Sequence, residues 1–110
     1  MNKTTIEKGS THDVMMPLLV AMFTEFKDIS KKKPDSAISK HKLIITNRLL
    51  EKVREVLVDE ESIDFLDLLN EDDVPQVSDV TLILSQYVAA MNAFKERFYG
   101  WNGAEHAWFT

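Results

Sequence analysis

The sequence predicts an all-α protein, an antiparallel four-helix bundle with a short third helix and an aromatic C-terminal tail. Residues 80–94 contain no charged side chain. Their apolar residues recur every three or four positions, which is helical spacing with a wide apolar face. Proline, glycine and capping residues divide the rest of the chain into segments with the same spacing. A chain of 110 residues is long enough to bury a core as a single domain.

The first helix is expected to begin at Ser10 or Thr11, which favour helix N-caps, and to end near residue 30. The polar residues 1–10 before it are expected to form a flexible N-terminal tail. Pro17 lies inside this helix, so either its first turn is kinked or the regular helix begins near Met16. One stripe of this segment is apolar, consisting of Met15, Leu19, Met22, Phe26 and Ile29.

The second helix is expected over residues 36–58. Pro34 ends the first helix, and Asp35 or Ser36 then supplies a cap. The buried stripe of this helix is expected to contain Ile38, Ile45, Leu49, Val53 and Val56.

A break near Asp59 separates the second helix from a short third one over residues 61–70. If the second helix continued, its buried stripe would next place Glu60 and Asp67 in the core, whereas the apolar residues restart at Ile63.

The fourth helix is expected over residues 78–99 and to end at Gly100, because glycine is common just after a helix C-terminus. The domain therefore spans 11–100, and the tail 101–110 carries Trp101, Trp108 and Phe109, which we expect to pack on the bundle or on a partner subunit. The expected core consists of Leu19, Met22, Phe26, Leu49, Val53, Val56, Leu66, Ile83, Tyr87 and Phe94.

The net charge of −5 conceals two oppositely charged segments. Residues 27–54 hold nine Lys or Arg and three acids, whereas residues 55–94 hold ten acids and no Lys or Arg. Such a chain is a poor non-specific ligand for nucleic acid, which requires a basic surface. The basic segment from Lys31 to Lys42 is the best candidate for that alternative function.

The composition argues against several classes of site and of protein. Without cysteine the chain has no disulfide framework, zinc–thiolate site or cysteine nucleophile. The two longest uncharged runs, residues 14–24 and 80–94, are shorter than the roughly 18 to 20 residues of a membrane span. We therefore expect a cytoplasmic protein without membrane contact. The histidines His12, His41 and His106 lie in separate segments without a ligand pair, and we expect no cofactor.

Four carboxylates in the third segment follow a spacing of 4, 3 and 4 positions: Glu60, Asp64, Asp67 and Glu71. On a helix this row would be a solvated face or would bind a basic partner protein. Glu61, Asp64 and Asp67 are the candidate ligands for a divalent metal, because Mg²⁺ and Ca²⁺ prefer oxygen ligands. With Glu55, they define the alternative of a small metal-dependent all-α hydrolase.

The favoured function is a non-enzymatic helical interaction module, a small regulatory, adaptor or inhibitor protein acting as a homodimer. The uncharged stretch 80–94 of the fourth helix has more apolar surface than one bundle is expected to cover, and exposed apolar patches mark association sites. The predicted interface consists of Leu84, Tyr87, Val88, Met91, Phe94, Trp101 and Trp108.

Overall fold

The computed structural model describes residues 5–101 and 103–108, although the side chain of Trp101 lies outside this description. Its elements are α1 (Thr5–Lys32), α2 (Lys40–Leu57), the 3-10 helix η1 (Glu61–Phe65), α3 (Val77–Phe98), β1 (Tyr99–Trp101) and β2 (His106–Trp108). The chain is mostly helical, as predicted. The predicted four-helix bundle is wrong, because the described residues contain three α-helices, which contact one another pairwise.

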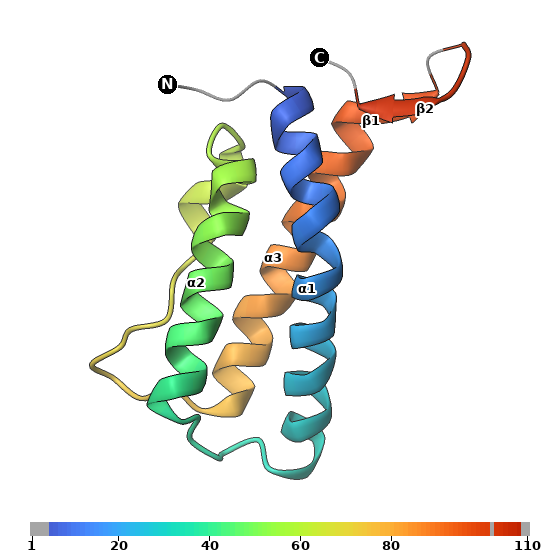
Figure 1. The fold of residues 1–110 in the computed structure, drawn as a ribbon. Coiled ribbons are helices and arrows are strands. Elements are labelled where there is room, and N and C mark those ends of the chain that lie inside the picture. Colours follow the sequence, from blue (N-terminus) through green and yellow to red (C-terminus); the bar gives the residue numbers. More distant parts are fainter. Residues whose placement is uncertain (1–4, 102, 109–110) are drawn as a thin grey trace.

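The start of α1 and the β1–β2 hairpin lie at the same end of the molecule (Figure 1). α1 begins at Thr5, before the predicted Ser10 or Thr11, so residues 5–10 of the predicted N-terminal tail are helical. Gly9 and His12 are buried on this first part of α1, so tertiary packing extends the helix where the polar sequence indicated a tail.

Pro17 does not interrupt α1, which is one helix on both sides of it. The predicted late start of the regular helix near Met16 is therefore wrong. Proline inside a helix removes one backbone hydrogen bond and crowds the preceding turn. Here His12 before the proline and Leu19 after it are both buried, and their packing offsets that cost.

α2 begins four residues later than predicted, at Lys40, and its N-cap is Ser39 in place of Asp35 or Ser36. The backbone before it has a different role. The carbonyl oxygens of Ser36 and Pro34 accept hydrogen bonds from the first two N–H groups of α3, at 2.8 and 3.1 Å. These N–H groups have no partner within their own helix, so the α1–α2 connection completes the start of α3.

The predicted third helix is reduced to the single 3-10 helix η1, which buries no side chain. Residues 66–70 after it have no regular secondary structure. The Asn47 side chain accepts a hydrogen bond from the Leu69 N–H at 2.8 Å and donates one to its carbonyl oxygen at 2.7 Å. Tyr87 donates to the carbonyl oxygen of Asp67 at 2.8 Å, and Arg54 donates to that of Leu66. Side chains of α2 and α3 therefore take the place of the missing helical hydrogen bonds.

α3 ends at Phe98, and the chain turns directly into β1, so the prediction that Gly100 ends the helix is wrong. Gly100 pairs with Ala107 in an antiparallel ladder, flanked by Tyr99 opposite Trp108. Gly103 in the connecting turn has a φ of +99°, a conformation that favours glycine.

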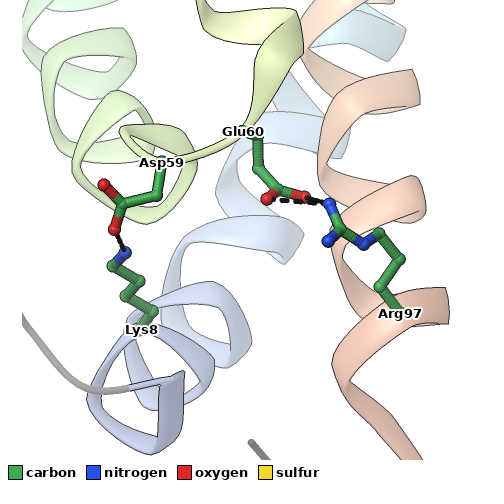
Figure 2. Close-up of polar contacts among 4 residues, drawn as sticks. All are labelled: Lys8, Asp59, Glu60 and Arg97. Atoms are coloured by element: carbon green, nitrogen blue, oxygen red, sulfur yellow. Dashed lines mark hydrogen bonds and ion pairs between the residues drawn. The ribbon is translucent and has the colours of Figure 1, made fainter.

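Two ion pairs connect the turn after α2 with α1 and α3 (Figure 2). Lys8 of α1 pairs with Asp59. Nη1 of Arg97 on α3 lies 3.0 Å from both carboxylate oxygens of Glu60. The turn between α2 and η1 is thus held from both sides.

Candidate functional site

An apolar groove between α1 and α2 is the strongest candidate for a functional site. Its cavity has a volume of about 360 Å³. A second hollow of about 350 Å³ continues it and shares Leu18, Ile45 and Leu49 with it. The first cavity is lined by Leu18, Ala21, Met22, Glu25, Phe26 and Ile29 from α1 and by Lys42, Ile45, Thr46 and Leu49 from α2.

The helical spacing of its residues explains why this groove stays open. The fully buried side chains of α2 include Leu43, Leu50, Val53 and Leu57, which places Ile45 and Leu49 to one side of the core. On α1 the buried Leu19 leaves its neighbour Leu18 facing outward, 52% exposed. An apolar stripe thus remains on the pair of helices after the core is complete.

The two walls of the groove carry opposite charges. Glu25 lies on the α1 wall, whereas Lys42, Arg48 and Lys52 lie on the α2 wall. A surface with an apolar floor and charged margins has the composition of a helix-binding groove, so the arrangement is suited to binding and specificity.

The residues predicted as a dimer interface lie outside the α1–α2 groove. Leu84, Tyr87, Met91 and Phe94 on α3 are at most 2% exposed, because α1 and α2 cover them within one chain. The premise that a single chain could not cover this helix is therefore wrong. Val88 is half-buried, Trp108 packs on α1, and the side chain of Trp101 lies outside the described residues, as does Phe109.

The predicted core is correct at seven of its ten positions. Met22, Leu49 and Ile83 are half-buried instead. Two of them, Met22 and Leu49, line the α1–α2 groove. Each of α1 and α2 carries two adjacent rows of apolar residues, which is a pattern visible in the sequence. Only the contacts with the third helix reveal which row packs in the core and which row lines the groove.

The predicted acidic row does not form along a helix. Asp64 lies in η1, Asp67 follows it in irregular backbone, and Glu71 lies in a later turn. Glu60 instead pairs with Arg97. Among residues 5–101 and 103–108, no group of three His, Asp or Glu side chains is placed to hold a metal ion, so the structure does not bring the candidate ligands Glu61, Asp64 and Asp67 together as a site.

Two titratable groups have shifted pKa values, and both shifts arise chiefly from burial. Burial lowers the pKa of His12 below its usual 6.5, although a hydrogen bond with the Met91 carbonyl opposes the shift. Burial raises the pKa of Tyr87 above 10, and the nearby Arg54 opposes this. Tyr87 thus remains a hydrogen-bond donor to Asp67 at neutral pH.

Comparison with protein-family models, curated proteins and solved structures finds no match for this chain. Within the described part of the chain, no helix is both long and apolar enough to cross a bilayer.

Proposed function

We propose that the protein is a non-enzymatic helical interaction module that forms a homodimer through the α1–α2 groove. The observation that carries this proposal is the open apolar floor of the groove, where Leu18 is 52% and Ile45 is 36% exposed. Two helices of a second copy would cover this floor and complete a four-helix arrangement across the interface. The unpaired helix face predicted from the sequence thus lies on α1 and α2 in place of α3.

The exposed area of the chain supports the same proposal. A compact monomer of this mass, 12.6 kDa, exposes roughly 6200 Å², whereas this chain exposes 7006 Å². The excess of roughly 800 Å² equals the share of one partner in a standard protein interface. The radius of gyration of 15.1 Å likewise exceeds the roughly 13 Å of a compact domain of this length. The chain therefore exposes more area than a compact monomer of its mass.

The charges on the two walls favour a particular geometry. A two-fold axis parallel to the groove would place α1 of one copy against α2 of the other. Glu25 would then face the partner copy's Lys42 at one end of the groove, and the same contact would repeat at the symmetric position. An axis perpendicular to the helices would instead oppose α2 to α2 and bring the basic walls together. Electrostatic complementarity selects the first arrangement.

The dimer fits the role of a small regulatory, adaptor or inhibitor protein. The acidic side chains of Asp64, Asp67 and Glu71 are exposed and lie outside the α1–α2 groove. They would remain accessible to a basic partner protein after the two copies pair.

Light scattering at several concentrations tests the proposal. The wild-type chain is expected to show twice the mass of one 12.6 kDa chain at tens of micromolar, and Leu18→Glu is expected to show the single mass, because it buries a charge in the groove. Leu82→Glu is the matched control, since Leu82 is 61% exposed on α3, outside the groove. A wild-type monomer at these concentrations, or equal effects of the two variants, would refute the proposal.

A further inference from the structure

The side chain of His12 is buried and forms a hydrogen bond through one ring nitrogen. His12 is 2% exposed, and its Nε2 lies 2.8 Å from the carbonyl oxygen of Met91. A carbonyl only accepts hydrogen bonds, so Nε2 carries the proton and donates. Nδ1 is then the bare nitrogen of a neutral ring. It is buried, and no group within the described residues forms a hydrogen bond with it.

The same ring supports the C-terminal hairpin. Trp108 of β2 lies with its ring centroid 5.1 Å from that of His12, and Phe94 of α3 stacks on the imidazole at 6.0 Å. The Trp108 indole N–H also donates to the carboxylate of Asp13, the residue after His12. The hairpin thus contacts α1 through a side chain that rests directly on an ionisable ring.

We propose that His12 is a proton-operated latch, whose neutral ring holds the β1–β2 hairpin on α1 and whose protonation releases the hairpin. A protonated ring would carry a second N–H at Nδ1, in a place where the described residues provide no acceptor. An imidazolium buried between two aromatic rings without that hydrogen bond is strongly disfavoured. Moving Trp108 away lets water reach the ring, so the proton and the hairpin compete.

The charges around His12 do not remove this competition. On α1, the neighbouring Asp13 favours the protonated ring, whereas Lys95 on α3 disfavours it. Lys8, one turn earlier on α1, is paired with Asp59 of the turn after α2. From the hairpin, the group in contact with the ring is the uncharged Trp108.

The direction of the pH effect follows from the burial of the ring. Burial lowers the pKa of His12 while the hairpin is docked, and release returns it toward its usual value of 6.5. Docking is therefore fully favoured above that value and is lost as the pH falls through the lower, docked pKa. Between these two pKa values, the ratio of released to docked hairpin rises by about tenfold for each unit by which the pH falls.

Nuclear magnetic resonance on the full chain, titrated from about pH 8 to about pH 4, tests the latch. The ring signal of His12 is expected to titrate below the usual value of 6.5 for histidine. The indole signal of Trp108, assigned with a Trp101→Phe variant, is expected to change with the same midpoint as His12. A His12 signal that titrates at or above 6.5, or a Trp108 signal unchanged while His12 titrates, would overturn the proposal.

A pair of variants separates the latch from general acid unfolding. His12→Gln retains an N–H for the Met91 carbonyl but does not titrate, so the transition at Trp108 is expected to disappear. His106→Gln, an exposed change on the same hairpin, is expected to leave it in place. Far-ultraviolet circular dichroism is expected to stay constant through the transition. A transition that persists in His12→Gln, or that coincides with loss of helix, would contradict the latch.

Discussion

The indole N–H of Trp108 donates a hydrogen bond to the carboxylate of Asp13, with 3.0 Å between Nε1 and Oδ2. This bond joins the last strand to the first helix. The same ring lies over Gly9, where an added Cβ would be 2.4 Å from two ring carbons. Glycine inside a helix is less favourable than alanine by about 1 kcal/mol, so the close approach of Trp108 gives the physical reason for glycine at this position.

The effect of Gly9→Ala is therefore expected to depend on Trp108. In the wild-type chain the added methyl group collides with the indole, so the change should lower the free energy of unfolding. In a Trp108→Ala background the collision is absent, and the same change should raise it by about 0.5 to 1 kcal/mol. Chemical denaturation of the four proteins measures this cycle. The same sign in both backgrounds would show that the ring does not cover Gly9.

Asn47→Ala is expected to destabilise the fold by about 2 to 4 kcal/mol, because it leaves both the N–H and the carbonyl of Leu69 without their partner in a buried place. Asn92→Ala, on the exposed surface of α3, serves as the control and is expected to cost less than about 0.5 kcal/mol. Urea denaturation measures both. Similar midpoints for the two variants would mean that the segment after η1 is not held by Asn47.

Leu50 and Leu49 are adjacent but should respond differently to truncation. Leu50 is fully buried, so Leu50→Ala is expected to cost about 2 to 5 kcal/mol of unfolding free energy. Leu49 is half-buried in the groove wall, so Leu49→Ala is expected to cost less and to weaken dimerisation instead. Denaturation and light scattering on both variants separate the two effects. A larger stability loss for Leu49→Ala than for Leu50→Ala would support the sequence-based prediction that Leu49 lies in the core.

The ion pair between Lys8 and Asp59 should be sensitive to which partner is removed (Figure 2). The side chain of Lys8 is 8% exposed and that of Asp59 is 60% exposed. Asp59→Asn leaves a buried ammonium group unpaired, whereas Lys8→Met removes the buried charge and keeps an apolar side chain in its place. Asp59→Asn is therefore expected to lower the melting temperature more than Lys8→Met does. The reverse order would show that the ammonium group is solvated.

Helical periodicity predicted where the long helices lie in the sequence, but it did not determine which side of each helix faces the core. Leu49 and Leu50 both lie on the apolar side of α2, and contacts from α1 and α3 decide that Leu50 is in the core. The predicted stripe on α2 is therefore correct at Val53 and Val56 but includes Leu49 in place of Leu50. The interface was assigned to α3 for the same reason, because the coverage of Tyr87 by the rest of the chain depends on long-range packing.

The segments that were predicted wrongly are those whose backbone is held by distant side chains. Asn47 bonds Leu69 across 22 positions, and Trp108 contacts Gly9 at the opposite end of the chain. Neither contact leaves a periodic pattern in the local sequence, so residues 61–70 resembled a helix. The β1–β2 pairing was not predicted either, although Trp108 packs on the bundle as expected. For the same reason the ionisable site at His12 could not be recognised, since its surroundings come from α1, α3 and β2.

Mixing two charge-reversal variants tests the groove dimer most directly. Glu25→Lys and Lys42→Glu are each expected to weaken self-association, because in the proposed two-fold arrangement each places like charges opposite one another. An equimolar mixture restores opposite charges at both symmetric contacts, so we predict that light scattering of the mixture recovers the mass of a dimer at a concentration where each variant alone is monomeric. A mixture that remains monomeric while the wild-type chain is dimeric would contradict the pairing of α1 with the partner copy's α2.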